Sequence, residues 1–124
     1  MIDHGNGTVT DERTGLMWEQ GLCPTRYTWA DATTVRIAEL NGAALGGHTD
    51  WRPPTRAELA SLVDDTRYDP AIDPIFSCQS GYYWSATPYQ DTPSYAWYVD
   101  FYDGYVTALN RPSNGCVRGV RGGS

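Results

Sequence analysis

The sequence predicts an α+β domain, residues 1–124 as a single unit, with an N-terminal β-hairpin, two helices and a C-terminal antiparallel meander. Short strand-type runs separated by turn pairs lie at both ends of the chain, and two capped apolar stripes of helical period lie between them. Helices and strands that are segregated along the chain, instead of alternating, are typical of α+β folds with antiparallel sheets.

The first predicted element is a hairpin in residues 6–19. Asn6 and Gly7 turn the chain in, Thr14 and Gly15 turn it back, and strand-type residues follow each turn. We expect this hairpin to place Leu16 and Trp18 on one face.

Two helices follow the hairpin. Thr28, with Asp31 three residues later, resembles a capping box, and the helix that it begins closes at Asn41-Gly42. The stripe expected to pack on the core consists of Trp29, Ala32, Thr33, Ile37 and Leu40. The second helix has a clearer start, because Thr55 is followed by Glu58 at the reciprocal capping position.

The remaining strand-type runs are residues 82–87, 95–102, 105–110 and 116–122. Asp103-Gly104 predicts a two-residue hairpin turn in which Tyr102 faces Tyr105 and Tyr98 faces Leu109. In this register one face is apolar, with Trp97, Val99, Phe101, Val106 and Ala108. The opposite face carries Tyr98, Asp100, Tyr102, Tyr105, Thr107 and Leu109.

The phenol-rich face has two interpretations. It is either a half-exposed sheet whose tyrosines pair across strands, or a recognition surface, since tyrosine offers a large contact area at little cost in rotamer entropy. The loop before it adds further polar and amphipathic residues. The predicted ligand-binding residues are Tyr89, Gln90, Asp91, Tyr95, Tyr98, Asp100, Tyr102, Tyr105, Asn110 and Asn114.

Charge and composition exclude several classes of protein. The net charge of −6 argues against binding to nucleic acid, because like charges repel. The sequence contains no run of about 20 apolar residues, so membrane insertion is not expected. Five Trp, nine Tyr and two Phe indicate a globular chain with an unusually high aromatic content.

Residues that carry chemistry are sparse. His4 and His48 have no cysteine or acidic pair at ligand spacing, and no serine lies in a nucleophile elbow. Oxygen ligands that suit calcium lie in the acidic stretch at residues 64–73 and near the glycine turn of residues 3–11. The second stretch lacks the terminal Glu and the spacing of a full calcium loop, and turn formation explains these residues better. We therefore expect a protein that is not an enzyme and needs no cofactor.

Arginines and cysteines are assigned architectural roles. Arg118 and Arg121 lie in a compact apolar strand and must be paired if buried, with Asp11, Asp50 or Glu58 as candidates.

Three cysteines leave at least one thiol outside any intramolecular disulfide. The pair considered is Cys78 with Cys116, provided that the compartment is oxidising.

Six motifs follow one another along the chain: GNGTVTDERTGLMWE, TWADA, GGHTDWRPPTRAELASLV, YYWSAT, AWYVDFYDGYV and VRGVRGG. Their order resembles that of the bacterial Lcl C-terminal-type domain family, a domain of unknown function found in a collagen-like adhesin. The resemblance covers nearly the whole chain. It implies a C-type-lectin-like fold, in the variant shared with formylglycine-generating enzymes, and a secreted or surface-displayed domain that binds protein or glycan.

The resemblance also implies hypervariable ligand display in some relatives, where the region that corresponds to residues 98–114 is diversified. The chain departs from the family in three respects. Family members often carry cysteines where Arg36 and Gly119 stand here, the acidic charge does not suit the polyanionic glycans associated with the adhesin, and of the two clustered cysteines of the enzymes only Cys116 is present.

The expected function is a non-enzymatic ligand-binding module, extracellular or at the cell surface, that uses the tyrosine-rich sheet face. Trp97 is expected to build the core on the other side of the sheet. The alternatives are an enzyme related to the formylglycine-generating oxidases, and a structural domain that forms homo-oligomers through its tyrosines.

Overall fold

The computed structural model describes the chain apart from residues 22, 24, 79–80, 91–93, 111–113 and 123–124, and confirms the α+β class. One sheet has the strand order β1-β2-β3-β7 and the other the order β4-β5-β6, and all pairs are antiparallel. The strands are β1 Ile2–Asp3, β2 Thr8–Asp11, β3 Leu16–Glu19, β4 Tyr82–Pro88, β5 Tyr95–Asp100, β6 Tyr105–Asn110 and β7 Val120–Arg121.

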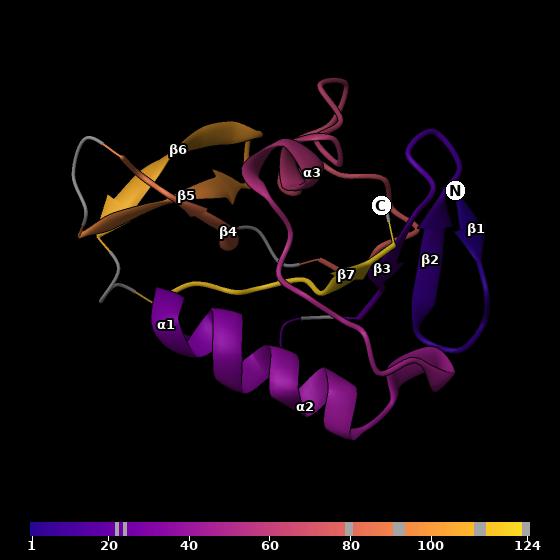
Figure 1. Cartoon of the computed structure of the whole chain (residues 1–124). Helices are drawn as coiled ribbons and strands as arrows, with labels where there is room; N and C mark the ends of the chain where they lie inside the picture. Colours follow the sequence, from indigo (N-terminus) through magenta and orange to yellow (C-terminus); the bar gives the residue numbers. More distant parts are fainter. Residues whose placement is uncertain (22, 24, 79–80, 91–93, 111–113, 123–124) are drawn as a thin grey trace.

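The main helix consists of α1 Trp29–Asp31, a π-helical stretch Ala32–Arg36 and α2 Ile37–Gly42. A short 3₁₀ turn, Leu45–Gly47, follows, and α3 spans Arg56–Ala60. Figure 1 shows the two sheets at opposite ends of the molecule, the main helix along one side, and the yellow C-terminal segment running between them. No helix in the described part of the chain has the length and apolar character needed to cross a membrane.

Both predicted helix starts are confirmed. The Thr28 hydroxyl accepts a hydrogen bond from the Asp31 N–H. At α3 the Thr55 hydroxyl accepts from the Glu58 N–H at 3.2 Å, while the Glu58 carboxylate accepts from the Thr55 N–H at 2.9 Å. These bonds satisfy amide groups that the first helical turn leaves without partners. Arg52 also binds both oxygens of Glu58, at 2.8 and 2.7 Å.

Two hydrophobic clusters form the core. The first joins the N-terminal sheet, α3 and one side of the β4-β5-β6 sheet, and is centred on Val9, Leu16, Trp18, Leu59, Leu62, Ile72, Phe76, Tyr83, Val99, Phe101, Cys116 and Val120. The second lies between the main helix and the other side of that sheet, and contains Ala32, Ile37, Leu40, Trp51, Trp84, Ala96, Tyr98 and Val117. The β4-β5-β6 sheet is therefore packed on both faces.

The C-terminal segment, residues 115–121, hydrogen-bonds to both sheets. Cys116 forms a parallel bridge with Tyr83 of β4, whereas Val120 pairs with Trp18 of β3. The prediction that residues 116–122 form a fourth strand of the meander is therefore wrong. The segment leaves the edge of β4 and ends as β7 in the N-terminal sheet.

Arg118, on this segment, is only 1% exposed. Its guanidinium donates to the backbone carbonyls of Glu19, Gly21 and Ser77. It also lies over the rings of Phe76 and Tyr83, at 4.9 and 5.6 Å from their centroids. Among the described residues no carboxylate forms an ion pair with it, so carbonyl dipoles and aromatic faces stabilise the buried charge.

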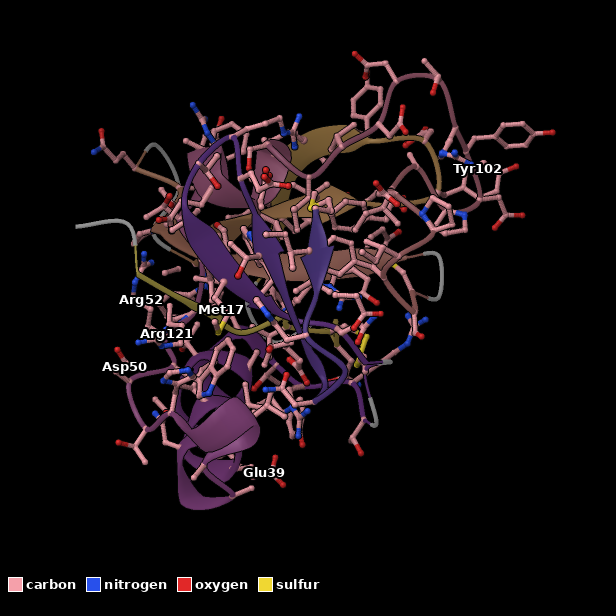
Figure 2. All side chains as sticks on the ribbon, turned by 90° about the vertical axis from the view of Figure 1, so that its right-hand side faces the viewer. Met17, Glu39, Asp50, Arg52, Tyr102 and Arg121 are labelled. Atoms are coloured by element: carbon pink, nitrogen blue, oxygen red, sulfur yellow. A yellow bond between two sulfur atoms is a disulfide. The ribbon has the colours of Figure 1, made fainter. Side chains whose placement is uncertain are left out.

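The three carboxylates considered as partners of Arg118 pair with arginines other than Arg118. Asp50 pairs with Arg121 at 2.6 Å, as predicted, and Figure 2 shows these two side chains beside each other. Asp11 pairs instead with Arg13, at 2.9 Å.

A carboxylate also connects the main helix to the C-terminal segment. Glu19 accepts the Gly119 N–H at 3.0 Å with one oxygen and forms an ion pair with Arg36 through the other. Gly119 is restricted by packing, because a Cβ there would lie 2.5 Å from a Leu40 methyl carbon.

The disulfide joins Cys23 to Cys116, so the predicted pairing of Cys78 with Cys116 is wrong. The two Cα atoms are 5.7 Å apart, within the range that a disulfide requires. Cys78 lies outside this bond, and its thiol is 3.4 Å from the Tyr83 hydroxyl oxygen. The sequence could not identify Cys23 as the partner, because the fold brings together residues 93 positions apart.

We predict that reduction of the Cys23–Cys116 disulfide lowers the free energy of unfolding by about 2 to 5 kcal/mol, because the bond closes a long loop in the unfolded chain. Chemical unfolding with and without a reductant measures the difference. A Cys78→Ser variant should show the same difference, and an unchanged midpoint on reduction would contradict the assignment.

Candidate functional site

The turn between β5 and β6 is longer than predicted. It contains residues 101–104, so Asp100 pairs with Tyr105 and Tyr98 with Thr107. Phe101 does not pair with β6, because its backbone bonds to other segments. Its N–H donates to the Gly81 carbonyl, its carbonyl accepts from the Ala71 N–H, and its side chain is buried. The pairing moves by two residues, which leaves the two sets of strand residues on the predicted sides of the sheet.

The pleat of β5 divides the predicted binding residues between two faces. Tyr98 and Asp100 point to one side, and Tyr95 and Trp97 to the other. Ring contacts agree with this division, because Tyr98 packs against Tyr82 and Trp84, whereas Trp97 packs against Tyr89. The single surface expected from the sequence is therefore two surfaces on opposite sides of one sheet.

The first surface, called here the tyrosine face, contains Tyr82, Tyr98, Asp100, Tyr105 and Thr107. Tyr82, Asp100 and Tyr105 are direct cross-strand neighbours on β4, β5 and β6. Tyr98 and Thr107 form the next cross-strand pair. Tyr82 and Tyr105 are 37% and 67% exposed, so two phenols flank a carboxylate at the open end of the sheet.

Tyr98 is buried beneath the tyrosine face and is not an exposed contact residue, which corrects the expectation from the sequence. Its side chain is 8% exposed and belongs to the second core cluster. Tyr82 lies edge-on over it, with the ring centroids 4.7 Å apart. Burial raises the pKa of the Tyr98 phenol, and the neighbouring Tyr82 and Asp100 raise it further.

Asp100 also shapes the turn. Its carboxylate accepts a hydrogen bond from the Tyr102 N–H at 3.0 Å, and Asp103 accepts likewise from the Tyr105 N–H at 3.1 Å. Tyr102 lies within the turn, is 50% exposed, and stands at the periphery of the molecule in Figure 2. These turn bonds fix the backbone on which Tyr105 is presented.

The other predicted binding residues lie elsewhere. Tyr89 and Tyr95 are half-buried on the opposite side of the sheet, and Gln90 is exposed beside them. Asn114 is exposed just before the C-terminal segment. Asn110 is the last residue of β6, and Asp91 lies outside the described residues.

Trp97 was expected in the core, but it is only half-buried. The Arg56 guanidinium carbon lies 4.3 Å from its ring centroid, and Tyr89 packs edge-on against it at 5.1 Å. The strand extends beyond the core at this end, so the indole is covered by polar and amphipathic side chains.

Tyr82 is the residue of the tyrosine face that the sequence prediction missed. The alternation in residues 82–87 places Tyr82 on the same side of its strand as Trp84. Its position beside Asp100 depends on the register between β4 and β5, which local sequence does not determine.

The acidic stretch considered for calcium is used for turn formation. Asp64 binds the Thr66 N–H and hydroxyl and the Arg67 guanidinium, and Asp73 accepts from the Ile75 N–H. A hollow of about 400 Å³ lies beside Asp64 and Asp73. In the described part of the chain no group of three or more His, Cys, Asp or Glu is arranged to hold a metal ion.

A family model described as the Lcl C-terminal domain matches residues 7–121. The match includes the main helix and every named strand except β1, so the chain belongs to this family. No curated protein matches the chain.

We predict that Tyr98→Ala lowers the free energy of unfolding by about 3 kcal/mol, because it removes a buried ring. Tyr105→Ala should change it by no more than about 0.5 kcal/mol, because that ring is exposed. Urea unfolding measures the free energy of unfolding of both variants. Equal effects would show that Tyr98 is not buried beneath the tyrosine face.

Proposed function

We propose that this domain is a non-enzymatic binding module that recognises neutral carbohydrate through the tyrosine face. The observation that carries the proposal is the cross-strand row of Tyr82, Asp100 and Tyr105, with two exposed phenols on either side of a carboxylate. Aromatic rings offer an apolar surface to the C–H faces of a sugar, while phenol and carboxylate oxygens hydrogen-bond to its hydroxyl groups.

The support beneath the row favours a preorganised site. Tyr82 rests edge-on against Tyr98, which in turn packs edge-on against Trp84 with the ring centroids 6.3 Å apart. A ligand that binds rings already held in place loses less conformational entropy than one that must order them.

The charge of the surface supports a neutral ligand. Asp100 lies in the row and Asp103 in the adjoining turn, and the chain has a net charge of −6. Carboxylates at the site repel sulfated or uronic polymers but accept hydrogen bonds from sugar hydroxyl groups.

The disulfide supports a location outside the cytosol, because disulfides persist in oxidising compartments. We therefore propose a secreted or surface-displayed domain with a C-type-lectin-like fold. The bonding of Cys116 to Cys23 favours a binding role over the oxidase alternative, since a disulfide-bonded Cys116 cannot act as a catalytic thiolate.

The proposal predicts that the domain binds members of a glycan array containing neutral and anionic oligosaccharides. Tyr82→Ala combined with Tyr105→Ala should weaken binding at least about tenfold, as expected when exposed aromatic contacts are lost. Ile2→Ala is the control, because Ile2 is exposed on β1, which belongs to the other sheet.

Binding that survives the double substitution would contradict the proposal. So would an array in which only anionic glycans bind, or one in which no glycan binds while a protein partner is retained through the same tyrosines.

A further inference from the structure

The opposite side of the β4-β5-β6 sheet carries a second aromatic surface. Arg56 of α3, Tyr89 from the β4–β5 connection, and Tyr95 and Trp97 of β5 meet there, and we call this group the Arg56 platform. Tyr89 contacts both β5 rings, at 5.1 Å from Trp97 and 6.5 Å from Tyr95 between centroids. The Arg56 guanidinium carbon is 4.3 Å from the Trp97 ring centroid.

The fold holds Arg56 in place through its backbone. The Arg56 N–H donates to the Thr87 hydroxyl at 3.0 Å, and the Pro54 carbonyl accepts from the Ala86 N–H at 2.6 Å. These bonds attach the start of α3 to β4, so the guanidinium is carried by an anchored backbone and stacked against an indole.

The charge of Arg56 has no counterpart in the described part of the chain. Five of the eight described arginines form ion pairs with carboxylates: Arg13, Arg36, Arg52, Arg67 and Arg121. Arg118 is held by backbone carbonyls. Arg56 is exposed, and within the described ranges its guanidinium contacts only the Trp97 ring, so its N–H donors are available to a ligand.

The composition of the platform fits a protein partner. Trp, Tyr and Arg are the residue types most enriched among those that dominate protein–protein binding energy. A guanidinium binds a carboxylate through two parallel hydrogen bonds, and the indole keeps water from one side of it, which strengthens that pairing. We propose that the Arg56 platform docks an acidic, extended segment of a protein partner.

This surface is distinct from the proposed sugar site in position and in charge. The pleat of β5 puts Trp97 on the side of the sheet opposite to Tyr98 and Asp100. One surface presents carboxylates and the other a guanidinium, so the two surfaces select ligands of opposite character.

A peptide array tests the proposal with the domain itself as the probe. The array holds extended peptides in which Asp or Glu is flanked by apolar residues, together with copies carrying Asn or Gln instead. The domain should bind the acidic peptides, and binding should weaken as salt rises from about 0.15 M to about 0.5 M. Arg56→Gln should reduce binding at least about tenfold, as loss of a dominant interface residue does.

Arg26→Gln is the matched control. Arg26 is exposed and also has no carboxylate partner in the described part of the chain, but it lies beside Gly81 and not on the platform. It should leave peptide binding unchanged. Glycan binding should be the same in Arg56→Gln as in the unmodified domain, so failure of one proposal is distinguishable from failure of the other.

Three results would overturn the proposal: equal binding of the amide-substituted peptides, equal loss in Arg26→Gln and Arg56→Gln, or retention of acidic peptides by Arg56→Gln. Light scattering measures the oligomeric state of the domain and of Arg56→Gln. If the unmodified domain is a dimer and Arg56→Gln is a monomer, the platform binds a second copy of this chain, and the proposal of an acidic segment from another protein is overturned.

Discussion

The structure depends on the buried guanidinium of Arg118. Its donors bind three backbone carbonyls, two of them at and after the end of β3 and the third in the segment before β4, while Phe76 and Tyr83 cover its faces. Arg118 lies on the segment that bonds to one sheet through Cys116 and to the other through Val120. One side chain therefore links the end of β3 to the segment before β4 and to the Tyr83 ring of β4, and it gives the buried Glu19 carbonyl a donor. The Cys23–Cys116 disulfide connects the same parts of the chain covalently.

This central arrangement explains how a small domain keeps two chemically different surfaces on one sheet. Glu19 links the main helix to the C-terminal segment, through an ion pair with Arg36 and a hydrogen bond from the Gly119 N–H. Core packing covers both faces of the β4-β5-β6 sheet close to the segment, with Val99 on one side and Tyr98 on the other. Beyond that region each face is open. The end near the β5–β6 turn presents Tyr82 and Tyr105, and the end near the start of α3 presents Arg56 and Trp97.

Features determined by neighbouring residues could be predicted from the sequence, and features that depend on distant partners could not. The Thr55 capping box, the N-terminal hairpin and the family membership follow from motifs a few residues long. The burial of Tyr98 depends on Trp84 and the main helix, and the longer turn depends on Gly81 and Ala71, which bind the backbone of Phe101. The alternation of residue types along β5 predicted which side chains share a side of the sheet. It did not predict how much of each side the rest of the chain covers.

Comparison of Arg118→Met with Arg121→Met by chemical unfolding tests the central claim most directly. Methionine fills much of the same volume but donates no hydrogen bond, and the three carbonyls stay in place because they belong to the backbone. We predict that Arg118→Met lowers the free energy of unfolding by about 3 kcal/mol or more, as expected when buried polar groups lose a charged donor. Arg121→Met removes only a pair with the exposed Asp50 and should cost no more than about 1 kcal/mol. Equal stability of the two variants would contradict the claim that Arg118 joins the sheets.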